Sequence, residues 1–257
     1  MSRGCRRASA LVAFALLLPS PACHSGGGEV AGTPVVADLR VLFIGNSLTY
    51  QNNLPEIVRA IAETAGGPAI EVRTVAFPDF SLEDHWNRGD ALRAIDEGGW
   101  DVVVLQQGPS TLPESRANLV EWTGRFAERI RAVGGRPALH SVWPPRSQAN
   151  GFDLVRASYA GAAEAVDGIL IPAGEAWRAV WAVDPNVPLY AGDDFHPSVL
   201  GSVTAAYVIW QRLTGRSPVG LPPVIDGGTS VRIDLGPERA ALLQEAAAEA
   251  NSGFGQG

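Results

Sequence analysis

The chain of 257 residues has little of several residue types on which particular protein classes depend. It has two cysteines, Cys5 and Cys23, which excludes a small scaffold built on disulfides. Its basic residues are scattered and its formal net charge is −7, which argues against a nucleic-acid binder. The apolar run at residues 8–18 is too short for a membrane-spanning helix, which needs roughly 20 residues. Four histidines leave few choices for chemistry that depends on imidazole.

Residues 1–22 have the pattern of a signal peptide. Three arginines precede the apolar run, and small residues follow it. Cys23 directly after this segment resembles the lipidated cysteine of bacterial lipoproteins, although Ser20 stands where that family usually has leucine. The alternative is plain secretion with cleavage near Ala22. We therefore expect an exported protein, periplasmic or at the cell surface, that contacts the membrane only through a lipid anchor at Cys23.

After a glycine-rich tether at residues 23–38, the sequence predicts one α/β domain over residues 39–250. Strands are predicted at residues 41–45, 70–75, 101–105, 137–142 and 169–172, and helices at residues 54–65, 91–97, 115–133, 198–213 and 237–250. Strands separated by helices pair in parallel through right-handed crossovers, and nearly continuous apolar strands indicate a sheet covered on both faces. Ligands bind such sheets at the carboxyl ends of the strands.

Two segments at that edge of the sheet are candidates for chemistry. Gly45-Asn46-Ser47 follows the first strand, where backbone N–H groups beside the serine can stabilise an oxyanion. The alternative is a plain turn or helix cap. Asp193 and His196 precede a late helix, and an aspartate at this spacing can orient the imidazole and fix its tautomer. The alternative there is a capped helix start.

Together the two segments resemble the SGNH, or GDSL-type, hydrolase family over about residues 40–215. The resemblance implies a flavodoxin-like three-layer α/β/α sandwich with a five-stranded parallel sheet. It implies that Ser47 is the nucleophile, that His196 is its general base and that Asp193 orients His196. Asp194 falls at an unpaired position of the motif.

The family builds its oxyanion hole from three donors, and the sequence departs from two of them. The first is the N–H of the serine itself. The second is a glycine N–H after the second strand, where this chain has Asp79 or Phe80, and a carboxylate near an oxyanion would raise the barrier. The third is an asparagine side chain after the third strand. This chain offers Gln106, Gln107 or Ser110 there, and strand alternation lets only one of the two glutamines face the site.

Three further residues have open roles. His85 either contacts substrate or packs on Trp86 at a helix surface, and Trp143 either forms an aromatic wall for a sugar or stiffens a loop. His140, inside the fourth strand, is expected to be a hydrogen-bonded core residue. No His, Cys and Asp cluster has metal-ligand spacing and no glycine-rich loop follows a strand, so we expect neither a metal nor a cofactor.

The sequence therefore predicts an exported serine esterase. Family analogy favours small acyl groups, such as acetate on a carbohydrate, so the expected partner is a small-molecule or carbohydrate ester and not nucleic acid. The oligomeric state is left open. The alternatives are a non-catalytic carbohydrate-binding protein on the same fold, a lipase or O-acyltransferase, and a flavodoxin-like cofactor binder, against which the missing phosphate loop counts.

Overall fold

The computed structural model describes Met1 and residues 37–254. The chain divides into two units, residues 1–34 and residues 35–257, and every helix and strand given below belongs to the second unit. The predicted leader apart from Met1, Cys23 and nearly all of the predicted tether lie outside the described residues.

Five strands form one parallel sheet in the order β2-β1-β3-β4-β5. They are β1 (Leu39–Gly45), β2 (Ile70–Ala76), β3 (Val102–Leu105), β4 (Arg136–His140) and β5 (Ile169–Ile171). Phe43 of β1 pairs with Thr74 of β2 on one side and with Val104 of β3 on the other. Because β1 and β3 lie inside the sheet, their apolar residues are buried on both faces. The predicted five-stranded parallel sheet is confirmed.

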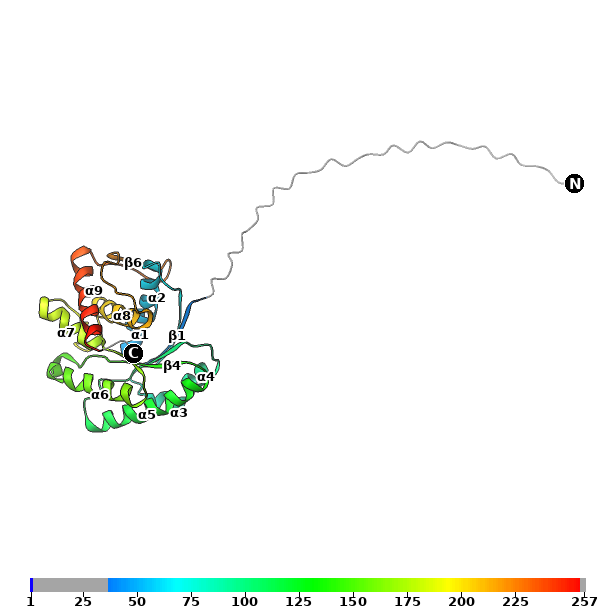
Figure 1. Cartoon of the computed structure of the whole chain (residues 1–257), viewed down its shortest axis with the longest axis horizontal. Coiled ribbons are helices and arrows are strands. Elements are labelled where there is room, and N and C mark those ends of the chain that lie inside the picture. The colour runs from blue at the N-terminus through cyan, green and yellow to red at the C-terminus, as the bar shows by residue number, and fades with distance from the viewer. Residues whose placement is uncertain (2–36, 255–257) are drawn as a thin grey trace. The chain divides into compact units, whose positions relative to one another are not determined.

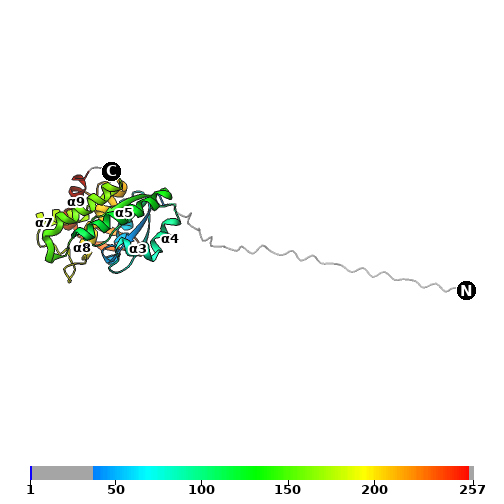
Figure 2. The same ribbon diagram turned by 90° about the horizontal axis from the view of Figure 1, so that it is seen from below.

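Helices cover both faces of this sheet (Figure 1). One layer consists of α1 (Ser47–Tyr50), α2 (Leu54–Thr64), α7 (Ala173–Val183), α8 (Val199–Thr214) and α9 (Pro237–Ser252). The other consists of α3 (Leu82–Arg88), α4 (Asp90–Asp96), α5 (Pro113–Ala132) and α6 (Phe152–Ala165). Figure 2 shows α3, α4 and α5 from the side of this second layer. The three-layer α/β/α sandwich is thereby confirmed. Within residues 37–254, no helix is long and apolar enough to cross a membrane.

Several elements have no counterpart among the predicted ones. They are α1, α3, α6, α7, the short 3-10 helices η1 (Gln51–Asn53) and η2 (Arg146–Gly151), and an antiparallel hairpin of β6 (Val224–Asp226) and β7 (Arg232–Asp234). The helix α3 begins at a capping box in which the Ser81 and Asp84 side chains bond each other's backbone N–H groups. This cap fixes where the chain turns after β2.

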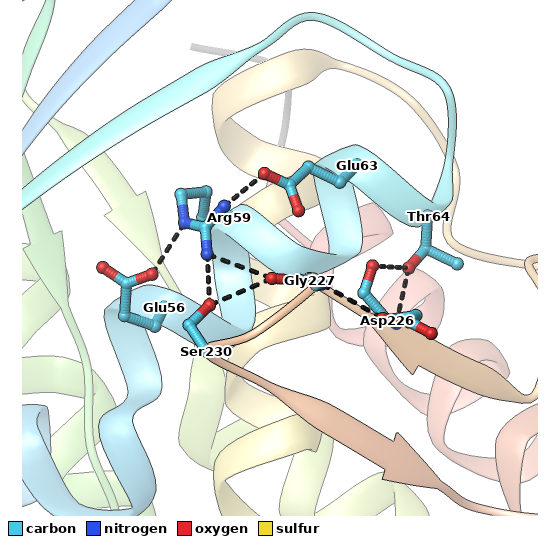
Figure 3. Close-up of polar contacts among 8 residues, drawn as sticks. Glu56, Arg59, Glu63, Thr64, Asp226, Gly227 and Ser230 are labelled. Carbon is cyan, nitrogen blue, oxygen red and sulfur yellow. Dashed lines mark hydrogen bonds and ion pairs between the residues drawn. The ribbon is translucent and has the colours of Figure 1, made fainter.

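The hairpin packs on α2 through Arg59 (Figure 3). The Arg59 guanidinium forms ion pairs with two glutamates of α2 and donates hydrogen bonds to Ser230 Oγ and to the Gly227 carbonyl. A Cβ added at Gly227 would lie 2.6 Å from the Cβ of Ala60, so only glycine lets the hairpin lie this close to the helix. The hairpin therefore extends the helical layer that contains α2.

The order of the strands determines where a ligand site can form. From β1 the chain passes to β2 on one side, and the later strands β3, β4 and β5 follow on the other side. The connections therefore change direction between β1 and β3, and a crevice opens outside their carboxyl ends at this switch point. The turn after β1 and the turn after β3 meet at this place.

Candidate active site

Three side chains form a hydrogen-bonded line at the carboxyl edge of the sheet. The distance from Ser47 Oγ to His196 Nε2 is 2.9 Å, and the distance from His196 Nδ1 to Asp193 Oδ2 is 2.5 Å. Ser47 begins α1 directly after β1, whereas His196 and Asp193 belong to the loop between α7 and α8. Residues 149 positions apart in the sequence thus lie within the reach that a nucleophile and its base require.

The loop around His196 keeps Asp193 ionised. Asp193 Oδ1 accepts hydrogen bonds from the backbone N–H groups of Phe195 and His196, at 3.1 and 2.9 Å. The hydrogen bond from the His196 ring, followed by these N–H groups, lowers the pKa of Asp193 to about 2. An ionised acceptor at Nδ1 holds the ring proton there, so the lone pair of Nε2 faces Ser47. Asp194 instead forms an ion pair with Arg146 at 2.6 Å.

Trp143 supports this loop from inside the molecule. Its indole Nε1 donates a hydrogen bond to the Phe195 carbonyl at 3.1 Å, directly before His196 in the chain. Its ring stacks on Trp177 with centroids 3.7 Å apart. Trp143 is fully buried, so it does not form the exposed aromatic wall that was one of its two predicted roles. It fixes the loop instead, because the stacked ring cannot turn toward solvent.

The Gln106 side chain forms hydrogen bonds with the serine turn, which we define as residues 45–49. Its Oε1 accepts hydrogen bonds from the Asn46 N–H at 2.9 Å and from the Thr49 hydroxyl at 2.6 Å. Its Nε2 donates to Asn46 Oδ1 at 2.9 Å and to the Gln107 carbonyl at 2.5 Å. The side chain is fully buried and both ends of its amide are bonded. Gln106 therefore faces the turn, which leaves it out of the predicted oxyanion hole.

His85 supports the same turn at the end of β1. Its Nε2 lies 2.7 Å from the Gly45 carbonyl, which can only accept, so Nε2 carries the proton. Burial lowers the pKa of His85, which keeps the ring neutral. The ring is fully buried against Phe77 and Phe80. His85 therefore lies neither in contact with the solvent-open site nor on a helix surface, and both predicted placements are wrong.

A cleft of about 480 Å³ opens beside Ser47. Of the predicted site residues, Ser47, Asp79, Phe80, Gln107 and Ser110 line it. The sequence reasoning missed others in the wall, among them Asn46, Ser81, Ser115, Asn118 and Phe195. Asn46 and Phe195 adjoin predicted residues in the chain, which is a usable signal. Ser81 likewise follows the predicted Phe80. No motif marks Ser115 and Asn118, because their place in the wall depends on how α5 lies against the loops.

Several backbone N–H groups at the cleft have no hydrogen-bond acceptor within residues 37–254. They include those of Ser47 and Asp79, and also those of Gly108 and Ser110 in the loop after β3. The Phe80 N–H donates to the Phe77 carbonyl at 3.4 Å, so Asp79 is the free donor of the loop after β2. Asp79 has a φ of 60°, in the left-handed region that glycine adopts most easily. This fits a position where the resembled family has glycine. The Asp79 side chain is exposed and forms no ion pair in the described part of the chain.

The amide of Gln107 is also already bonded. Its Oε1 accepts from the Leu82 N–H at 3.1 Å, and its Nε2 donates to Ser110 Oγ at 3.0 Å and to the Ser115 carbonyl at 3.4 Å. Ser110 Oγ in turn donates to the Gly108 carbonyl at 3.0 Å. These contacts fix the wall of the cleft. The side-chain N–H groups of both predicted glutamines donate to other acceptors, so neither is free to bind an oxyanion.

His140 differs from its predicted state in one respect. It lies in the core at the end of β4, as expected, but neither ring nitrogen has a hydrogen-bond partner within residues 37–254. Complete burial lowers the pKa of His140 to about 4. The ring is therefore neutral at pH 7. In the same described residues, no cluster of three or more His, Cys, Asp or Glu side chains could hold a metal ion.

No protein family profile and no curated protein sequence matches the chain. Solved structures do match it. A DUF4886 family protein from Bacteroides uniformis superposes with a TM-score of 0.69 at 21% identity, over 83% of this chain and 95% of that chain. A proposed SGNH hydrolase from Slackia heliotrinireducens superposes with a TM-score of 0.57 at 29% identity, over 69% of this chain and 99% of that chain. A catalytic mutant of an acetylxylan esterase from Geobacillus stearothermophilus superposes with a TM-score of 0.56 at 16% identity, over 72% of this chain and 97% of that chain. The sheet order, the three layers and these likenesses show that the chain has the α/β fold of the SGNH hydrolases.

Proposed function

We propose that the chain is a serine esterase that acts through Ser47, His196 and Asp193. The observation that carries the proposal is the hydrogen-bonded line from Asp193 through His196 to Ser47, with distances of 2.5 and 2.9 Å. The fold-level likeness to a proposed SGNH hydrolase, a GDSL-like lipase and an acetylxylan esterase supports ester hydrolysis as the reaction class.

In the proposed mechanism, His196 Nε2 takes the proton of Ser47 Oγ as that oxygen attacks the ester carbonyl. The N–H groups of Ser47 and Asp79 stabilise the oxyanion that forms. His196 then returns the proton to the leaving alkoxide, which departs as an alcohol and leaves an ester on Ser47. Water attacks this ester while His196 takes its proton, and the bond to Ser47 Oγ breaks as His196 gives that proton to Ser47 Oγ. The acid is released and both side chains return to their starting states. Asp193 orients the ring and stabilises the imidazolium in both steps.

The cleft favours a neutral ester of a small acid. Asp79 is the only charged residue among those that line it, and the others carry hydroxyl, amide or apolar groups. An ester with an anionic acyl group would therefore meet no cation there. Acetate on a sugar hydroxyl meets these conditions, and one structural neighbour is an acetylxylan esterase.

The test is p-nitrophenyl acetate hydrolysis by the wild type and by Ser47→Ala, with folding checked by circular dichroism. We expect the variant to lose about 10³-fold or more in kcat, because the covalent route is removed. Equal rates would overturn the proposal and favour the non-catalytic carbohydrate-binding alternative. A strong preference for octanoate over acetate would favour the lipase alternative.

We also propose that the chain is exported and lipid-anchored at Cys23, on the basis of its N-terminal sequence pattern. The test is to express the full chain in a bacterium and compare the wild type with Cys23→Ser. We expect the wild type in the membrane fraction and the variant in the soluble fraction. If both are soluble after the leader has been removed, the chain is secreted without an anchor.

A further inference from the structure

A second cavity, of about 330 Å³, adjoins the cleft at Ser47. Pro109, Ser110, Ser115 and Phe195 line both cavities. The shared residues show that the two cavities are neighbours. A substrate bound at Ser47 that continues past Phe195 would reach the second cavity.

The position of His196 indicates which half of an ester would enter this second cavity. His196 Nε2 is bonded to Ser47 Oγ and must return a proton to the leaving oxygen, so the alcohol half departs on the His196 side. Phe195 directly precedes His196, and their rings pack edge to face with centroids 5.3 Å apart. In the proposed mechanism the N–H groups of Ser47 and Asp79 bind the carbonyl oxygen instead. The alcohol half is thus the part that passes Phe195.

The walls of the second cavity indicate the chemistry of that alcohol. None of the residues that line it is charged. Pro145 and Leu112 supply apolar surface, and Leu112 is 64% exposed. The side chains of Thr111 and Gln148 also line it, and neither forms a side-chain hydrogen bond within residues 37–254. Free hydroxyl and amide groups beside apolar surface suit a ligand with hydroxyl groups on an apolar ring face.

We propose that the second cavity is the subsite for the leaving alcohol, that it selects an uncharged polyhydroxyl alcohol such as a sugar, and that Leu112 and Gln148 determine this selectivity. The proposal rests on the proposed esterase function and deepens it. It assigns the two halves of the ester to different cavities, which makes it testable independently of whether Ser47 is the nucleophile.

The test varies the two halves of the ester separately. Leu112→Trp fills the second cavity and Gln148→Ala removes its amide, whereas Val183→Trp is a matched control, since Val183 is 72% exposed and lines neither cavity. One substrate pair is an acetylated methyl xyloside and ethyl acetate, which differ in the alcohol. The other pair is p-nitrophenyl acetate and p-nitrophenyl butyrate, which differ in the acid. The readout is the ratio of kcat/KM within each pair.

We expect Leu112→Trp and Gln148→Ala to lower the xyloside-to-ethyl ratio about tenfold and to leave the butyrate-to-acetate ratio as in the wild type. Val183→Trp should change neither ratio. A change in the acyl ratio instead, or no change in either ratio, would overturn the proposal.

A binding measurement separates failure of this proposal from failure of the esterase function. If the wild type hydrolyses no ester faster than Ser47→Ala, titration calorimetry with methyl xyloside still tests the subsite. We expect binding to the wild type and at least tenfold weaker binding to Leu112→Trp, with Val183→Trp like the wild type. Equal binding to all three proteins, or binding to none, would show that the cavity is not a sugar subsite.

Discussion

At the scale of single residues, Gln106 is the side chain on which the serine turn depends most. It is fully buried, and its amide forms four hydrogen bonds, two of them to Asn46. We expect Gln106→Met, which keeps the volume, to lower kcat about 10- to 100-fold with little change in KM. The reason is that buried groups left without partners each cost about 1–3 kcal/mol, and the turn relieves this by moving Ser47 away from His196.

Steady-state kinetics on p-nitrophenyl acetate test this prediction, with urea unfolding as the check that the variant is folded. A raised KM at unchanged kcat would contradict it, because that result would place Gln106 in the wall of the cleft. The sequence alone could not separate Gln106 from Gln107. Both follow β3 directly, and only the contact with Asn46, 60 positions away, distinguishes them.

His140 makes stability depend on pH. Its pKa is about 4 in the folded chain and about 6.5 when unfolded, so the unfolded state binds the proton first as the pH falls. The effect of His140 on the free energy of unfolding is therefore absent above pH 7. Between pH 6.5 and 4 its titration lowers that free energy. We expect a loss of about 2 kcal/mol between pH 7 and pH 5. Urea unfolding at the two pH values measures it, and His140→Leu should remove most of this difference; an unchanged pH dependence would contradict the assignment.

At the scale of elements, α7 and α8 pack so closely that one methyl group would separate them. A Cβ at Gly201 would lie 2.2 Å from the Leu189 carbonyl and 2.5 Å from Trp177. We expect Gly201→Ala to lower the free energy of unfolding by about 1–3 kcal/mol. It should also lower kcat, because the start of α8 fixes the loop that carries His196.

Gly161→Ala is the matched control for this prediction. Gly161 lies exposed in α6 with no atom within 4 Å of an added Cβ, so alanine should stabilise the helix by about 0.5–1 kcal/mol. Chemical denaturation of both variants provides the comparison. If the two glycine substitutions have the same effect, the close contact of α7 and α8 does not limit stability.

The strands and the two short motifs could be predicted from the sequence, whereas several helices could not. Short apolar runs mark buried strands, and Gly45-Asn46-Ser47 and Asp193 to His196 each lie within a few positions. The unpredicted α6 follows the 3-10 helix η2 without a side-chain cap, and the short α3 depends on a cap with aspartate in place of the usual glutamate. In α7 the buried face includes Gly174 and Ala176, whose small side chains give little periodic signal.

At the scale of the whole molecule, the charge of the protein disfavours anionic substrates. Removal of residues 1–22 would take away three arginines and no acid, which changes the formal net charge from −7 to −10. We expect mono-p-nitrophenyl succinate to have a lower kcat/KM than p-nitrophenyl acetate, because the field of the protein and Asp79 repel it. The difference in kcat/KM between the two esters should become smaller as the salt concentration rises from about 0.01 to 0.5 M, since the Debye length shortens over this range.

Kinetics with both esters across this salt range test the prediction, and Asp79→Asn should narrow the difference further at low salt. A difference that does not change with salt or with Asp79→Asn would mean that the succinyl group is excluded by its size.

The separation of 149 positions between Ser47 and His196 has a consequence for timing. The serine turn is made early in synthesis, but its base comes only after all five strands. Pairing strands so distant in the chain is slow, because long loops must close before any contact stabilises them. If the proposed roles hold, a chain that is still being synthesised has the serine and not its base, and is therefore inactive. On refolding, the return of the proposed esterase activity would report completion of the whole sheet.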